Sequence, residues 1–241
     1  PFLSVVNIIS GKTSSKLPNM PSCSHGIVFG LFFIYKSRKT GAKLLFYLGL
    51  ANMLAGLMFL GVFMDFLFVL FLRENIKNNG IVAILSYIWF APVIITSMYI
   101  GTELLIPKIK LHIFIIVLII SIIFEIIIFL DPLSSFNFIP EPPDAPDKNL
   151  IDYNVNLYTP AGMLMGGLLL LVLIFLGFGF LLKGLKTSGV IRKNFLFLST
   201  GSFCFCIFGL LEGLTVPGFT VIIVRIGYLS SFWLMYLGLK D

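Results

Sequence analysis

Seven apolar segments separated by polar links are the feature of this sequence that most limits its possible folds. A helix needs about 20 apolar residues to cross the hydrocarbon layer of a bilayer. Hydrophobic residues make up 58% of the chain and charged residues only 12%, whereas a soluble domain is about one quarter charged. We therefore predict an all-α fold, a polytopic integral membrane helical bundle in the cell membrane.

The predicted spans divide the chain into a short tail, residues 1–21, and one transmembrane domain, residues 22–241. The first segment is short for a span, and the longest link, about 131–159, is rich in proline, acids and asparagine. Such a composition predicts an irregular loop outside the hydrocarbon. The spans are expected at about 22–35, 44–72, 80–106, 111–130, 160–182, 191–214 and 218–239.

Basic residues alternate between successive links. The links after the first, third and fifth segments, together with the C-terminal tail, hold eleven of the 17 basic residues. Basic loops stay in the cytoplasm, so this alternation predicts an outside N-terminus, a cytoplasmic C-terminus and an outside location for loop 131–159. The eleven residues are Lys36, Arg38, Lys39, Lys43, Lys108, Lys110, Lys183, Lys186, Arg192, Lys193 and Lys240.

Four charged side chains fall in the outer third of the predicted bundle: Asp65, Glu125, Glu212 and Arg225. At a rise of 1.5 Å per residue, each lies roughly 8–12 Å below the predicted outer surface. A turn at Pro217-Gly218 would bring Arg225 back to the depth of Glu212, where the two charges can neutralise each other.

Two interpretations of these four residues remain open. In one, Glu212 and Arg225 form a structural ion pair, and Asp65 and Glu125 are protonated or solvated near the interface. In the other, the four line a polar pocket that opens outward and takes a small ligand, an ion or a proton. Three acids exceed what one arginine can neutralise, which favours the pocket for the group as a whole.

Glycine pairs and a proline in the sequence also predict close helix contacts and a helix bend. Two pairs of glycines, Gly162 with Gly166 and Gly209 with Gly213, have the small-x-x-x-small spacing of close helix packing. Pro92 predicts a kink in the third span, where Thr96 and Ser97 could bond the freed carbonyls.

No catalytic or cofactor motif is present. His25 and His112 are far apart, so the chain has no predicted metal site, and no histidine is placed to activate a serine. The predicted last span contains no lysine for a retinal Schiff base. We expect no cofactor and no nucleic-acid partner, and the sequence leans away from an enzyme.

Three stretches carry a resemblance of layout: YKSRKTGAKLLFYLGLANMLAG, LLKGLKTSGVIRKNFLFLSTG and VPGFTVIIVRIGYLSSFWLMYLG. The chain resembles the seven-helix membrane sensor regions at the N-terminus of some prokaryotic histidine kinases, and stand-alone archaeal proteins of that layout. The resemblance covers most of the chain and implies signal sensing. Because the sequence stops at Asp241 without an output domain, that role would require a cytoplasmic signalling partner.

The leading functional hypothesis is a receptor-like or sensor-like membrane protein with an outward-facing polar pocket. A small transporter or ion channel is the alternative, and it requires polar groups that continue to the inner face, for which Glu103, Thr96 and Ser97 are candidates. A non-catalytic subunit of a membrane complex is a further alternative.

Overall fold

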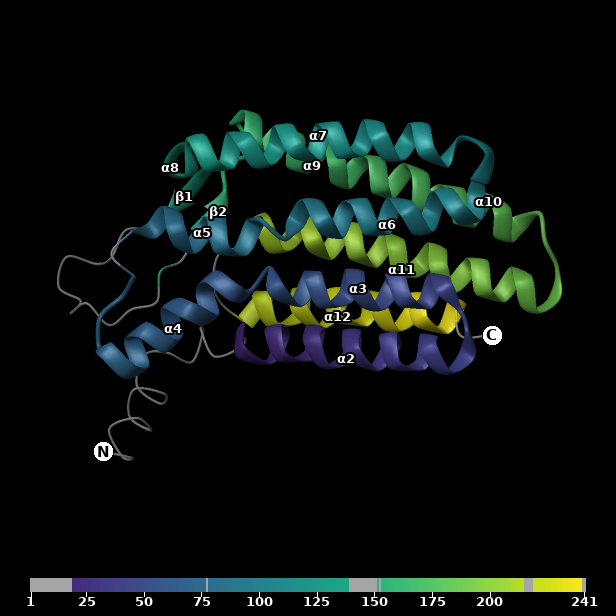
Figure 1. Ribbon diagram of the computed structural model, residues 1–241, viewed down its shortest axis with the longest axis horizontal. Helices are drawn as coiled ribbons and strands as arrows, with labels where there is room; N and C mark the ends of the chain where they lie inside the picture. Colours follow the sequence, from purple (N-terminus) through teal and green to yellow (C-terminus); the bar gives the residue numbers. More distant parts are fainter. Residues whose placement is uncertain (1–18, 77, 139–150, 152, 215–218, 240–241) are drawn as a thin grey trace.

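Long helices lying side by side form the whole body of the protein (Figure 1). The structure, a computed structural model, describes residues 19–76, 78–138, 151, 153–214 and 219–239. Residues 1–18 of the predicted tail 1–21, the Pro217-Gly218 turn and the proline-rich part of the outer loop, 139–150, lie outside the described residues. The elements are α2 (Asn19–Thr40), α3 (Lys43–Leu57), α4 (Leu60–Leu72), α5 (Asn79–Tyr87), α6 (Phe90–Leu105), η1 (Pro107–Ile109), α7 (Lys110–Leu130), α8 (Pro132–Ser135), β1 (Phe136–Phe138), β2 (Tyr153–Val155), α9 (Pro160–Val172), η2 (Leu173–Phe178), α10 (Gly179–Leu185), α11 (Gly189–Leu214) and α12 (Phe219–Leu239).

The all-α prediction is confirmed, and several helices are suited to a membrane. Four described stretches are long and apolar enough to cross one: Asn79–Leu105, Pro107–Leu130, Pro160–Leu185 and Gly189–Glu212. The pair α3 and α4 adds a fifth if its two bent parts count as one span. Because all backbone groups inside a bilayer must be bonded within the chain, such segments are helical.

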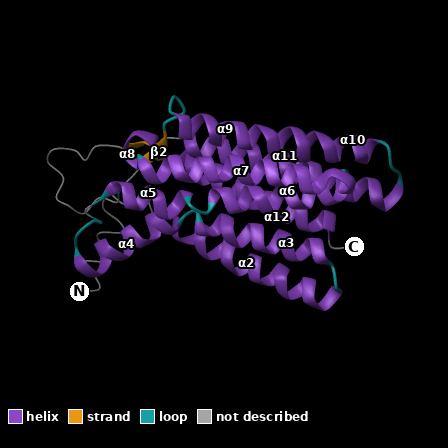
Figure 2. Ribbon diagram, turned by 45° about the horizontal axis from the view of Figure 1, so that its top comes forward, coloured by secondary structure: helices purple, strands orange, loops and turns teal. Residues whose placement is uncertain are grey.

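The links between the helices lie at two opposite ends of the bundle. The link from α2 to α3, the η1 turn and the link from α10 to α11 lie together at one end (Figure 1). At the other end lie α4, α5, α8 and the strands β1 and β2 (Figure 2). The basic links predicted to share one side of the membrane therefore lie at one end of the molecule. We call it the basic end, and the opposite end the hairpin end.

The first predicted span, about 22–35, is part of a longer helix that ends at Thr40. Helix α2 continues through the basic residues to Thr40, with Arg38 and Lys39 in its last turn. Cations are favourable there because a helix C-terminus carries a partial negative charge. Gly41, with φ of 73°, then ends the helix in the left-handed conformation that favours glycine.

Two of the long apolar stretches are interrupted. One break, at Ile88–Trp89, precedes Pro92, because proline lacks an N–H and collides with the carbonyl four residues earlier. The Thr96 hydroxyl donates to the Pro92 carbonyl at 2.7 Å. The other break, at Met58–Phe59, bends α3 against α4 by 43° without any proline.

Helix α4 packs closely against α5 just after the second break. A Cβ on Gly61 would lie 1.9 Å from the carbonyl oxygen of Val82, so α4 meets α5 at this residue with no room for a side chain. The Gly61 N–H donates to the Ser86 hydroxyl oxygen at 3.1 Å. That bond satisfies one of the amides that the start of a helix leaves without an intrahelical acceptor.

The predicted glycine motif at Gly162 and Gly166 is wrong. A Cβ on Gly162 would meet the backbone of Asn156 and Leu157 in the preceding turn, and Gly166 has nothing within 4 Å. Close helix packing occurs instead between α2 and α3. There a Cβ on Gly26 would lie 2.4 Å from the Cα of Gly56, and a Cβ on Gly30 would lie 2.7 Å from the carbonyl oxygen of Gly49.

The prediction of an irregular loop at 131–159 is also wrong in part. Strands β1 and β2 form an antiparallel hairpin in which Phe136 is opposite Val155 and Phe138 is opposite Tyr153. The ring of Tyr87 in α5 lies 4.7 Å from that of Phe136, measured between centroids. Aromatic side chains suit cross-strand pairing, and here they also attach the hairpin to the bundle.

Candidate functional site

An ion pair joins α11 to α12 near the hairpin end. The Nε and Nη2 atoms of Arg225 each lie 2.8 Å from the same carboxylate oxygen, Oε1 of Glu212. The side chains are only 13% and 24% exposed, respectively. The ion pair that was predicted between the last two helices is therefore present in the structure.

The ion pair also contacts the break between α3 and α4. The Arg225 guanidinium lies 5.4 Å from the ring centroid of Phe59, in cation–π geometry. Tyr87 and Tyr228 lie within electrostatic range of Glu212. The low exposure of both side chains and the Phe59 ring beside Arg225 partly exclude water, which strengthens the electrostatic interaction of the pair.

Asp65 has a different set of partners. Its side chain is fully buried, and its carboxylate accepts hydrogen bonds from the backbone N–H of Ile76 at 3.0 Å and of Ile151 at 2.8 Å. The side-chain amide of Asn75 donates at 3.2 Å. We call these four residues the Asp65 cluster. It joins α4 to two segments of the hairpin end that are far apart in sequence, and it contains no cationic side chain.

The Asp65 cluster matters to α4 because this helix is otherwise sparsely packed. Gly61 and Asp65 are its only buried residues. Phe71 and Leu72, near its end, are 75% and 62% exposed. The position of α4 therefore depends mainly on its close approach to α5 and on the bonds to one carboxylate.

Glu125 lies on α7, in a third environment. Both of its carboxyl oxygens are buried, and neither has a hydrogen-bond partner among the described residues. The buried hydroxyl of Ser121, one helical turn earlier, has none either. Of the four predicted site residues, the structure bonds Glu212 to Arg225 directly and gives Asp65 and Glu125 separate surroundings.

Comparisons with known proteins give no match. No family model, no curated protein and no solved structure matches the chain. The geometry and chemistry of the residues above are therefore the basis for assigning a role.

The transporter alternative requires polar groups that continue toward the basic end, and the candidates Thr96 and Glu103 do not bond to each other. Thr96 bonds within its own helix. Glu103 forms a salt bridge with Lys110 at 2.8 Å, and both side chains are more than one third exposed. Within the part of the chain that the structure describes, no three His, Cys, Asp or Glu side chains come together as a metal site.

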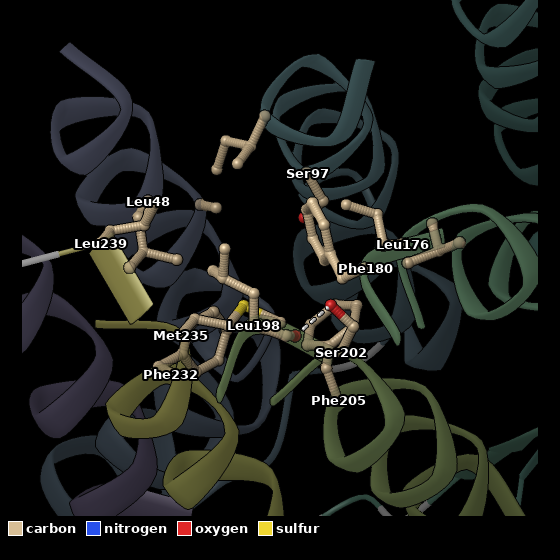
Figure 3. A pocket seen from close by; sticks show the side chains of 13 residues that line it. Leu48, Ser97, Leu176, Phe180, Leu198, Ser202, Phe205, Phe232, Met235 and Leu239 are labelled. Carbon is tan, nitrogen blue, oxygen red and sulfur yellow. Dashed lines mark hydrogen bonds between the residues drawn. The ribbon is translucent and has the colours of Figure 1, made fainter. Parts of the chain in front are cut away.

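Ser97 instead lines an apolar cavity whose walls come from α3, α6, α9, η2, α10, α11 and α12 (Figure 3). Its free space is about 20 Å³, which is enough for one water molecule. Val172, the last residue of α9, and Leu176, in the π-helical segment η2, form part of the wall. Ser202 also lines it, and its hydroxyl donates to the Leu198 carbonyl at 2.8 Å. Nothing in the sequence signalled this cavity, since its lining is ordinary apolar helix.

Asp131 caps the short helix at the hairpin end, after the end of α7. Its carboxylate accepts a hydrogen bond from the Ser134 N–H at 3.1 Å. Bonding to the side chain of Ser134 and then to its backbone lowers the pKa of the Asp131 carboxyl below its ordinary value. This exposed carboxylate stabilises the turn that leads into β1.

Proposed function

We propose that the protein is a receptor-like or sensor-like membrane protein with seven transmembrane helices. Its N-terminus lies outside, its C-terminus lies in the cytoplasm, and the hairpin end faces out. The gathering of the basic links at one end of the bundle supports this orientation, because basic links are retained in the cytoplasm. Helices α2 and α12 complete the count of seven spans.

The Asp65 cluster is the observation that carries the proposed role. It holds α4, the outer part of a broken helix, to segments of the hairpin end. A small ligand, an ion or a proton that competes for the Asp65 carboxylate would release α4 from those segments. Since α4 buries little else, its release costs little further packing.

The ion pair provides the route from α4 to the rest of the bundle. Phe59 lies at the joint of α3 and α4, and Arg225 contacts its ring. Movement of α4 about this joint would displace Arg225 relative to Glu212 and so bias the packing of α11 and α12. At the basic end, α2, α3 and α12 would present the change to a cytoplasmic signalling partner. A stimulus acts in this way only if it binds one of the two arrangements more tightly.

A distance measurement between spin labels tests this role. Labels at Phe71 on α4 and Leu130 on α7 are both exposed, 75% and 80% respectively. In lipid nanodiscs, Asp65→Asn should add a second population to the Phe71–Leu130 distance distribution, because an amide cannot accept as many bonds as a carboxylate. Glu103→Gln, which removes an exposed acid at the other end, is the matched control and should leave the distribution unchanged.

A single unchanged distribution in Asp65→Asn would contradict the proposal. Solute and proton uptake into proteoliposomes distinguishes the alternative. Uptake that the wild type supports and Asp65→Asn abolishes would assign the protein to transport instead of sensing.

A further inference from the structure

Glu125 on α7 has no hydrogen-bond donor or cation as a partner among the described residues, unlike the buried acids Asp65 and Glu212. Asp65 is held by N–H donors and Glu212 by Arg225. Glu125 has buried carboxyl oxygens and no bonded partner in the described chain. A carboxylate inside an apolar layer is strongly unfavourable unless a positive charge or hydrogen-bond donors compensate it.

The elements packed against α7 supply no compensating charge at this depth. Helices α8 and α9 carry no titratable side chain. Helix α6 carries Tyr99 and Glu103, and Glu103 is bonded to Lys110, which lies 15 residues or about 22 Å along α7 from Glu125. The η1 turn carries Lys108 at the same distant end, where His112 also lies near the start of α7. Asp131, beyond the near end of α7, is acidic and bonded to Ser134.

Ser121 gives the carboxyl an oxygen neighbour. Residues four apart lie on the same face of a helix, so the Ser121 hydroxyl and the Glu125 carboxyl share one face of α7. Ser121 is 1% exposed, and its hydroxyl has no partner in the described chain. Two buried oxygen-bearing groups, on adjacent turns of one helix and without partners among the described residues, are available to a species that needs oxygen ligands.

We propose that Ser121 and Glu125 form a binding site for a monovalent cation, taken up as a proton or as Na⁺. The cation neutralises the Glu125 carboxylate, and the Ser121 oxygen supplies a further ligand or hydrogen-bond partner. Carboxylate and hydroxyl oxygens are hard ligands, which suit both occupants. This site is separate from the Asp65 cluster and from the ion pair, and it holds whether or not the protein is a sensor.

Trp89, which is adjacent in sequence to Phe90, serves as a fluorescence probe for the site. The rings of Phe90 and Phe124 lie 5.2 Å apart and join α6 to α7 at this level. Trp89 precedes Phe90 in the chain, and Trp233 is the other tryptophan in the sequence. In Trp233→Phe, the fluorescence therefore reports Trp89 alone.

The experiment titrates purified Trp233→Phe protein in detergent along two arms, with fluorescence and melting temperature as readouts. One arm lowers the pH in a sodium-free choline buffer, and the other adds NaCl at an alkaline pH with choline chloride as the ionic-strength control. We expect a saturable change in at least one arm. A proton response alone assigns the proton as the occupant, and a sodium response assigns Na⁺.

Variants locate the response. Glu125→Gln should abolish the response and should fold at least as stably, because it removes a charge that has no partner among the described residues. Ser121→Ala should weaken a sodium response by about tenfold, the equivalent of one lost ligand bond, and leave a proton response in place. Glu103→Gln should retain every response of the parent. The proposal is overturned if neither arm changes the parent protein, or if Glu125→Gln responds as the parent does.

Discussion

Replacing Asp65 with alanine should destabilise the protein more than any other loss of a single acid. The substitution removes the acceptor of three donors in the Asp65 cluster. Asn75 is half-buried and can turn its amide to solvent, so its loss contributes little. The N–H groups of Ile76 and Ile151 are fixed in the backbone, and Ile151 is only 8% exposed.

The magnitude follows from those two amides. A buried donor left without a partner costs about 1–3 kcal/mol, so two such amides together cost about 2–6 kcal/mol. We therefore expect Asp65→Ala to lower the free energy of unfolding by about 2–6 kcal/mol. Asp131→Ala is the matched control, since it removes an acid of the same type and at the same end that is exposed and can be replaced by water.

Unfolding in detergent gives the global cost, and hydrogen exchange locates it. In Asp65→Ala the peptides containing Ile76 and Ile151 should lose protection, whereas the α11 and α12 peptides should change little. Equal destabilisation by Asp65→Ala and Asp131→Ala, with unchanged exchange at the two isoleucines, would refute the reasoning. It would mean that other contacts hold α4 in place.

Three further predictions concern other parts of the molecule. Glu212→Gln and Arg225→Gln should be non-additive in thermal unfolding, with a coupling of about 1–3 kcal/mol for this partly buried pair; additive losses would argue against the interaction. Gly61→Ala should destabilise by about 1–3 kcal/mol or more, because its new methyl group would overlap a backbone carbonyl. Gly166→Ala, at an open helical position, should be neutral or stabilising by up to about 1 kcal/mol; similar melting temperatures for both variants would contradict this packing. The pKa of Asp131 is lowered in the folded state, so its contribution is present above the unfolded-state pKa and is lost as the pH falls through the folded-state value. Hydrogen exchange in residues 131–138 should therefore accelerate in acid, and Asp131→Asn should remove most of that pH dependence; an unaltered profile in the variant would count against the cap.

Local signals in the sequence predicted features that depend on nearby residues. Pro92 indicated an interruption in its helix, and the break lies just before it. The acid and base on the last two helices indicated an ion pair, and Glu212 and Arg225 are 2.8 Å apart. The bend between α3 and α4 had no such signal, because it depends on how closely Gly61 approaches Val82 in another helix.

The sequence by itself determined that this chain is helical and built from apolar segments suited to a membrane. A bilayer leaves a spanning backbone few ways to satisfy its polar groups, so composition alone selects the helix. Only the tertiary structure decided which partners the buried acids have. Asp65 is bonded to the N–H groups of Ile76 and Ile151, and every residue except proline has such a group, so no side-chain pattern marks the amides that will meet a carboxylate. The sequence also could not show that Glu125 has no partner among the described residues, since that depends on which side chains the neighbouring helices place beside it.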